Sequence, residues 1–324
     1  MPPRQSTDDK LAELEAAADG ADAASLPAVL EKALGGRNYR VIALAARYAG
    51  DKLAYECVPQ LLEAYPRYLE KAAKRDPNCL AKRAIVRALY DLDCDDVDFF
   101  LTAMRYRQME PVWGGSVDTA TDLRNSAAMG LVASGYPRAL VEVAQLLSDS
   151  EAPVRGGAAR AIACGNPQQA ELLLRLKVLC GDEDALVIGE CFIGLLAVEP
   201  DESMAFVARF LDTEDDAVCE AAALALGESR LPAALNSLKA AWEGVLVSAE
   251  LRRVLVRAAA LHRSDEAFDW LLQLAAERDT PIATEIVDVL SIYRHNERLA
   301  ERLRAALETR DDQETKSMFE KVWA

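Results

Sequence analysis

The sequence VRGGAARAIACGNPQQAELLLRL at residues 154–176 has the same pattern as VCEAAALALGESRLPAALNSLKA at residues 218–240. Both stretches begin with valine, continue with neighbouring alanines, reach a glycine and then a proline, and turn leucine-rich. Apolar residues recur at intervals of three and four, which is the period of an amphipathic helix. The offset of 64 residues therefore indicates two units of about 32 residues, each made of two helices.

The same pattern recurs along much of the chain. Its units start at six positions separated by steps of 31, 33, 31, 33 and 31 residues: Leu123, Val154, Val187, Val218, Leu251 and Ile282. A helix pair of this kind has two apolar faces that it cannot bury alone, so neighbouring pairs must stack. The sequence predicts an all-α fold, a right-handed α-α superhelix (solenoid) of about eight helix pairs.

The composition and the residues at the predicted helix ends agree with this fold. The 324 residues include only 16 glycines and 13 prolines, and 6% are aromatic, which favours helices over sheets. Three prolines stand where a first helical turn tolerates a missing N–H, and three glycines stand where a left-handed turn ends a helix. They are Pro137, Pro167 and Pro232, and Gly135, Gly165 and Gly227.

The segments VRGGAARAIACG and AVCEAAALALGESRLPAALNSL resemble HEAT-like repeats, in particular the short bacterial kind named after phycobilisome lyases. The resemblance covers about residues 26–304. In HEAT repeats, an acid six residues before a base forms a ladder along the stack, and the resemblance implies this structural role for three pairs. These are Asp76 with Lys82, Asp118 with Arg124, and Asp149 with Arg155.

Three segments are expected. Residues 1–24 form a flexible or partly helical leader with Leu11, Leu14 and Ala18 on one face, and residues 25–308 form the repeat solenoid. Residues 309–324 form a capping segment, because a bare terminal repeat would expose a core face. Its apolar residues are Met318, Phe319, Val322 and Trp323.

The net charge of −16, from 37 basic and 53 acidic residues, argues against a nucleic-acid partner, since affinity for phosphates comes from basic residues. It argues equally against a HEAT-fold DNA glycosylase, which would need a basic concave face. The longest nearly apolar stretch, residues 185–198, is too short to cross a membrane. The seven cysteines have no C-x-x-C spacing, which predicts buried thiols in a reducing, cytoplasmic setting.

The repeat is interrupted at residues 105–121, RYRQMEPVWGGSVDTAT, where about ten extra residues separate two helices. One interpretation is a binding loop, in which Tyr106 and Trp113 form a contact surface and the glycine pair 114–115 is a mobile hinge. The other is that Trp113 folds back over an exposed end of the core. Both interpretations stay open at this stage.

A basic window from Arg67 to Arg87 is a local excess of positive charge in an acidic chain. It could receive an anionic partner or an acidic segment of another protein. The alternative is a solvated helix face without a partner. A separate acidic segment, DLDCDDVD at residues 91–98, lacks the glycine and glutamate of a calcium loop, so helix capping is the simpler interpretation.

Motifs for catalysis are missing. The sequence has no nucleophile elbow, Walker loop or dinucleotide fingerprint, and its two histidines, His262 and His295, have no metal-ligand spacing. This also argues against the HEAT-like iron hydroxylases, which need paired His-Glu motifs. No catalytic residue, metal or cofactor is therefore expected.

The sequence favours a non-catalytic scaffold that binds a protein or peptide through its concave face, lined by the second helix of each pair, and through the inserted loop. The candidate binding residues are Arg105, Tyr106, Trp113, Asp118, Arg124, Arg83 and Arg87. The resemblance also implies an alternative, a subunit of a bilin lyase-like complex that handles a tetrapyrrole. For that role Tyr106, Trp113 and Asp118 would have to form a pocket with an accessible acid.

Overall fold

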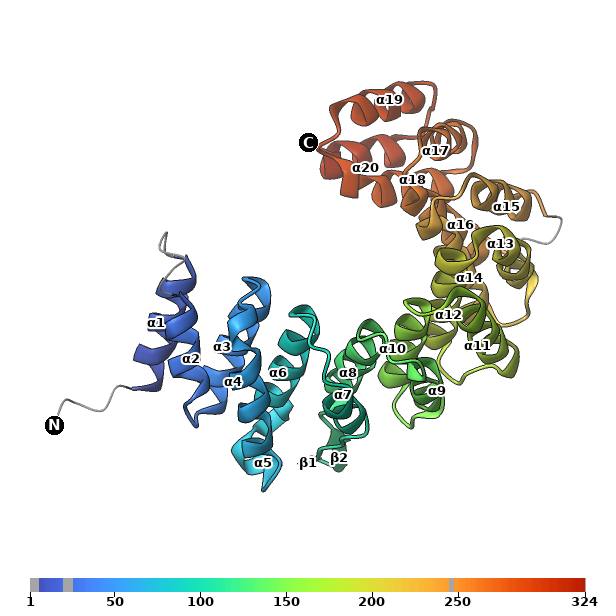
Figure 1. Cartoon of the computed structure of the whole chain (residues 1–324). Coiled ribbons are helices and arrows are strands. Elements are labelled where there is room, and N and C mark those ends of the chain that lie inside the picture. Colours follow the sequence, from blue (N-terminus) through green and yellow to red (C-terminus); the bar gives the residue numbers. More distant parts are fainter. Residues whose placement is uncertain (1–5, 20–25, 245–247, 324) are drawn as a thin grey trace. The chain divides into compact units, whose positions relative to one another are not determined.

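The computed structural model describes residues 6–19, 26–244 and 248–323. Within these residues the chain forms twenty α-helices, several short 3-10 helices and two strands, which confirms the all-α prediction. The chain divides into two compact units, Met1–Ala170 and Glu171–Ala324 (Figure 1). Each unit is a stack of helix pairs, in which we call the first helix A and the second B. The handedness of the superhelix remains a prediction.

Unit 1 begins with helix α1 (Thr7–Asp19), which contacts α2 and α3. Four helix pairs follow, each written A then B: α2 (Leu26–Leu34) and α3 (Tyr39–Asp51), α4 (Val58–Ala64) and α6 (Leu80–Asp91), α7 (Val97–Met104) and α8 (Thr121–Ala133), α9 (Ala139–Val143) and α10 (Ala152–Ala163). A short helix, α5 (Ala72–Arg75), lies between α4 and α6. The B helices α3, α6, α8 and α10 pack side by side (Figure 1).

Unit 2 is built in the same way. Its helices, again A then B, are α13 (Pro200–Ala208) and α14 (Asp216–Ser229), α15 (Pro232–Trp242) and α16 (Ala249–His262), α17 (Asp265–Glu277) and α18 (Thr280–Leu290), α19 (Glu297–Glu308) and α20 (Gln313–Trp323). Helix α11 (Pro167–Cys180) crosses the boundary between the units and precedes α12 (Ala185–Val198). The described helices therefore make nine pairs, where the sequence predicted about eight.

The predicted starting positions of all six repeats are confirmed. The B helices α8, α10, α12, α14, α16 and α18 each begin two residues before the six predicted unit starts. Acidic side chains set some of these beginnings: Asp184 accepts a hydrogen bond from the N–H of Leu186 (2.9 Å), and Asp215 accepts one from that of Ala217 (3.0 Å). Such caps satisfy N–H groups that have no partner inside the helix.

Only one of the three predicted glycine turns is present. Gly135 has a φ of +71°, as expected, but neither Gly165 nor Gly227 has a positive φ. Gly227 lies within α14, where a Cβ would stand 2.1 Å from the carbonyl oxygen of Ala258 in α16. The glycine is needed there because two neighbouring B helices approach closely, and Arg230, with a φ of +55°, ends the helix instead.

Both predicted end segments contain helices that cover a stack. In α1, Leu14 and Ala18 are buried, and residues 1–5 and 20–24 of the predicted leader lie outside the described part of the chain. At the other end, Phe319 of α20 is buried, and the indole N–H of Trp323 donates to the carbonyl of Val287 (3.0 Å). Helix α20 is thus the B helix of the last pair.

The cysteine prediction holds for five of the seven residues. Cys57, Cys79, Cys94, Cys191 and Cys219 are buried. Cys164 and Cys180 are exposed, because they stand at the ends of α10 and α11, where the helices meet solvent. All seven are free thiols, and burial raises the pKa of Cys79 and of Cys191 to about 12, which makes both unreactive near neutral pH.

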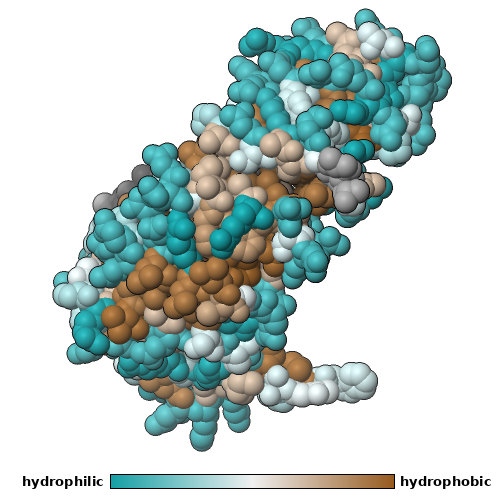
Figure 2. Space-filling model, turned by 90° about the vertical axis from the view of Figure 1, so that its right-hand side faces the viewer, coloured by the Kyte–Doolittle hydropathy of each residue, from teal (hydrophilic) through white to brown (hydrophobic). Residues whose placement is uncertain are grey.

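Some apolar side chains are left on the surface. Figure 2 shows that hydrophobic residues gather on part of one face of the molecule. In unit 2, Leu172, Leu176 and Leu179 form an exposed stripe along α11, and Leu186 is exposed at the start of α12. No helix of the described chain is both long enough and apolar enough to span a membrane.

The close approach at Gly227 gives a first prediction. Gly227→Ala is expected to lower the free energy of unfolding by about 1–3 kcal/mol, because the added methyl group meets main-chain atoms that cannot move aside. Gly189→Ala is the matched control in α12, where a Cβ would make only an ordinary contact at 3.5 Å. That control is expected to gain about 0.5–1 kcal/mol from helix propensity. Urea unfolding measures both, and equal effects would contradict the prediction.

Candidate binding site

The segment inserted between α7 and α8 forms a β-hairpin. Strands β1 (Met109–Val112) and β2 (Gly115–Asp118) pair antiparallel, with Met109 opposite Asp118 and Val112 opposite Gly115. Trp113 and Gly114 make the turn, in which Gly114 supplies the positive φ of +89°. The glycine pair predicted as a hinge is therefore part of a tight turn, which fixes the register of the strands.

The carboxylate of Glu110 ties the hairpin to the helix stack. It accepts hydrogen bonds from the N–H of Asn78 (2.7 Å), the amide of Gln108 (2.7 Å) and the hydroxyl of Thr119 (2.9 Å). Partial burial disfavours its charged form, but these hydrogen bonds outweigh burial and lower the pKa of Glu110. Since Asn78 precedes α6, the hairpin is anchored at the edge of unit 1 where that B helix starts.

Asp118 anchors the other strand from inside the protein. Its carboxylate accepts hydrogen bonds from the N–H groups of Ala120 (3.0 Å) and Gln108 (3.1 Å) and from the guanidinium of Arg124 (2.6 Å). Burial opposes ionisation, but the hydrogen bonds and the arginine charge prevail and lower the pKa of Asp118. Asp118 is therefore a charged group committed to holding the hairpin.

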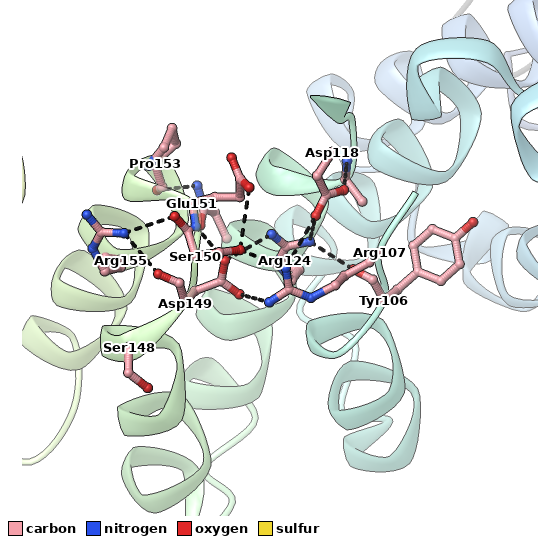
Figure 3. Close-up of polar contacts among 12 residues, drawn as sticks. Tyr106, Arg107, Asp118, Arg124, Ser148, Asp149, Ser150, Glu151, Pro153 and Arg155 are labelled. Atoms are coloured by element: carbon pink, nitrogen blue, oxygen red, sulfur yellow. Dashed lines mark hydrogen bonds and ion pairs between the residues drawn. The ribbon is translucent and has the colours of Figure 1, made fainter. Parts of the chain in front are cut away.

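Arg124 extends this contact into the predicted ladder (Figure 3). Besides Asp118, it donates to the carbonyl of Tyr106 (3.0 Å) and reaches the carboxylate of Asp149 in the next pair (3.3 Å). Arg107 also binds Asp149 (2.8 Å). A preceding pair, Asp76 with Lys82, is fully buried at 2.7 Å.

The ladder is thus confirmed for its first two pairs, and the third differs. Arg155 donates to the carbonyl oxygens of Asp149 (2.9 Å) and Ser150 (3.1 Å). The carboxylate of Asp149 is instead held by Arg124 and Arg107, because these side chains come from the preceding repeat and approach from its side (Figure 3). The acid therefore links two neighbouring repeats.

Removing the carboxylate of Asp118 from this ladder is expected to lower the stability of the protein strongly. Asp118→Ala leaves a buried guanidinium without its nearest partner and should cost roughly 3–5 kcal/mol in the free energy of unfolding. Asp122→Ala is the matched control, since Asp122 pairs with Arg83 (3.0 Å) in an exposed ion pair and should lose at most about 1 kcal/mol. Chemical denaturation at pH 7 measures the difference.

The effect of Asp118 should also depend on pH. Its pKa is lower in the folded than in the unfolded state, so its stabilisation is complete above the unfolded pKa of about 3.9. The wild type should lose its advantage over Asp118→Ala as the pH falls through the lowered folded pKa. An advantage that is unchanged down to the most acidic pH that preserves the fold would contradict this assignment.

The tip of the hairpin is apolar and exposed. Trp113 is fully exposed, at 104% of its reference area, and Met109, Val112 and Val117 are each about half exposed. The structure therefore contradicts the interpretation that Trp113 folds back over the core. A Trp on a rigid, well-anchored turn keeps its surface available for contact with another molecule.

This placement predicts that Trp113→Ala leaves the melting temperature unchanged, because the side chain covers no apolar surface. Trp242→Ala is the contrasting variant, since Trp242 is buried and packs edge-on against Trp270 with ring centroids 5.9 Å apart. The Trp242→Ala variant should lose about 3–5 kcal/mol in the free energy of unfolding, which lowers its melting temperature. Thermal unfolding followed by circular dichroism compares the two, and a marked loss in the Trp113 variant would show that the residue packs on the core.

A groove of about 810 Å³ runs over the exposed face of the B helices of unit 1. Helices α3, α6 and α8 provide most of its lining, with contributions from α1 and α10. Small side chains form much of its floor: Ala43 in α3, Ala84 and Ala88 in α6, and Ser126 in α8. Because these residues are small, the groove stays open between the longer side chains at its margins.

The groove carries a mixed charge with many arginines. Its charged residues are Arg40, Arg47, Arg83, Arg87 and Arg160, and Glu15, Asp51, Asp91 and Asp122. Arg83 pairs with Asp122 (3.0 Å), and Arg87 pairs with Asp91 (2.9 Å). Across the described ranges, no carboxylate lies within 4.0 Å of the guanidinium of Arg40 or Arg47. These two arginines are available to a ligand without loss of an internal pair.

The structure separates the predicted site residues into two places. Arg83 and Arg87 line the groove. Arg105 ends helix α7 and pairs with Glu142 (2.7 Å). Tyr106 is partly buried, with the ammonium of Lys82 5.5 Å from its ring centroid. Asp118 and Arg124, by contrast, are buried in the ladder and offer no surface to a partner, so we leave them out of the binding surface.

Sequence reasoning missed the arginines that the groove adds, above all Arg40 and Arg47. A signal was present: RYAGD at residues 47–51 and RALYD at residues 87–91 both place an arginine four residues before an aspartate at the end of a B helix. The same spacing on successive B helices brings both arginines to one face of the stack. A comparison restricted to exposed positions would have found them.

The grouping required for a tetrapyrrole pocket is not formed. Asp118 is buried in an ion pair, Tyr106 is partly covered at the base of the hairpin, and Trp113 stands at its tip. The three side chains therefore do not enclose a common space with an accessible acid. Likewise, the described residues contain no group of three or more His, Cys, Asp or Glu side chains placed to hold a metal ion.

No protein-family profile and no curated protein matches the sequence. Among solved structures, human deoxyhypusine hydroxylase in complex with glycerol is similar at 16% identity, covering 80% of this chain and 92% of that one, with a TM-score of 0.30. The structure of an engineered protein is similar at 18% identity, covering 97% and 93%, with a TM-score of 0.36. At these values neither similarity supports an inference about activity or ligands.

Proposed function

We propose that this protein is a binding module that holds a segment of another protein in the groove of unit 1. The observation that carries the proposal is the groove itself, about 810 Å³ of open space across several B helices. In helical-repeat proteins the core positions are committed to stacking, so the exposed helix faces are the positions free to bind. A polypeptide segment suits an elongated, open surface better than a compact metabolite, which needs a more enclosed pocket.

The lining favours a protein segment over a nucleic acid. Among the described residues that line the groove, none is aromatic, whereas single-stranded nucleic acids are held largely by stacking on aromatic rings. The carboxylates of Glu15, Asp51, Asp91 and Asp122 stand among the arginines, so the lining is not the continuous basic stripe that a phosphate backbone requires. The net charge of −16 for the whole chain acts in the same direction.

The hairpin supplies a second contact in this proposal. Its base is fixed by Glu110 next to the start of α6, a helix that also lines the groove. A partner bound in the groove and extending past this edge of unit 1 can meet the exposed ring of Trp113. Tryptophans of this kind contribute strongly to protein interfaces because one rigid side chain buries a large apolar area.

Blocking the groove tests the proposal. Ala84→Trp places a large ring on its floor, and peptides selected on the wild-type protein from a phage library of random 12-residue sequences are expected to lose binding to this variant. Val141→Trp is the matched control, because Val141 is an exposed apolar residue of α9 outside the groove. It should bind the selected peptides as the wild type does.

Three results would count against the proposal. Selection could yield no peptide, the selected peptides could bind the Ala84→Trp variant unchanged, or both Trp variants could lose binding equally. Circular dichroism shows that the variants keep their helical content. Trp113→Ala, tested with longer library peptides, measures whether the hairpin adds to the affinity.

A further inference from the structure

We infer that the segment bound in the groove runs across the B helices and presents carboxylates to Arg47 and Arg87. This inference rests on the proposed function, because it specifies the chemistry of the segment that the groove takes. Both arginines line the groove, and both side chains are exposed. They belong to neighbouring B helices, α3 and α6, so a ligand that crosses these helices meets one after the other.

Close packing places the two arginines at matching positions. Near the end of α3, a Cβ on Gly50 would lie 3.4 Å from the Cα of Ala88 in α6 and 3.3 Å from the carboxylate of Asp91. Asp51 is four residues after Arg47, just as Asp91 is four after Arg87. The two helices therefore run together with Arg47 beside Arg87, and the next contact, Arg83 with Asp122, continues the row toward α8.

The spacing of helices sets the spacing of the acids. Packed helices have axes about 8–10 Å apart, so equivalent side chains on α3 and α6 are separated by about 10 Å. An extended segment in the polyproline II conformation returns to the same face every three residues and advances about 9 Å in doing so. An α-helix advances about 10 Å in seven residues, which also lie on one face. The ligand is thus expected to carry acids three residues apart if it is extended, or seven apart if it is helical.

The other charges of the groove support an acidic peptide. Arg40, which is on α3 like Arg47, adds a third guanidinium to the groove. It has no carboxylate partner in the described ranges. Arg87 already pairs with Asp91 (2.9 Å), but this pair is exposed and such pairs contribute little, so a ligand carboxylate can compete for the arginine. The aspartates at the helix ends, Asp51 and Asp91, lie beside the arginines and disfavour a polyanion of uniform charge.

The test measures fluorescence anisotropy of labelled peptides with the full-length protein at low salt. One probe repeats Glu-Gly-Ser four times, and the other is a 21-residue Ala- and Gln-rich helical peptide with Glu at every seventh position. In the counterpart of each, Gln replaces Glu at those positions. At least one Glu probe is expected to bind about 3- to 30-fold more tightly than its Gln counterpart, as two exposed ion pairs would provide.

The double variant Arg47→Gln/Arg87→Gln is expected to lose this preference. The matched control Arg138→Gln/Arg298→Gln removes the same charge from exposed residues outside the groove and should keep it. The inference is overturned if neither Glu probe binds, if Glu and Gln probes bind equally, or if the Arg47 and Arg87 variant keeps the preference. Tighter binding of a 12-residue oligothymidylate, lost in the same variant, would overturn it in favour of a nucleic acid.

The outcomes separate the two proposals. If Ala84→Trp abolishes binding of the selected library peptides while the Glu preference is missing, the groove binds peptides and the inference about their acids fails. If Ala84→Trp has no effect on any peptide, the proposed function fails as well.

Discussion

The whole structure depends on the need of each helix pair to cover an apolar face that it cannot bury alone. The B helices meet this need by packing side by side with small residues between them, so that at Gly227 even a methyl group would meet the backbone of α16. Such close contact leaves little freedom in the placement of one pair on the next. It also fixes which residues face outward, and the proposed binding surface is made of these residues.

The inserted hairpin is tolerated because its base is tied to this stack by charged groups. Glu110 and Asp118 gather N–H groups and an arginine around two carboxylates, and Arg124 joins one repeat to the next through Asp149. Buried ion pairs add little net stability, but they are costly to break once formed. The ladder therefore holds the strands in one position, while Trp113 at the turn is fully exposed and packs on no part of the core.

The groove follows from the repetition of the helix pairs. Exposed positions recur with the helix period, so small residues and arginines at equivalent places in α3 and α6 form rows across the stack. Arg83 and Arg87 could be predicted because they stand in a basic window of the sequence, whereas Arg40 and Arg47 could not be found by local charge alone. Arg47, for example, belongs to the groove because it lies on the helix next to Arg87, a residue forty positions further along the chain.

The sequence by itself determined the class of fold and the phase of the repeat, since apolar spacing and capping residues act locally and placed six B helices correctly. It also determined the acid–base pairs at positions 76 and 82 and at 118 and 124, in which an acid just before a B helix meets a base six residues later in that helix. Only the tertiary structure decided that residues 109–118 pair as strands, that Gly227 serves close packing, and that Trp113 is exposed. These outcomes depend on distances between segments that are remote in the sequence, and local patterns contain no information about such distances.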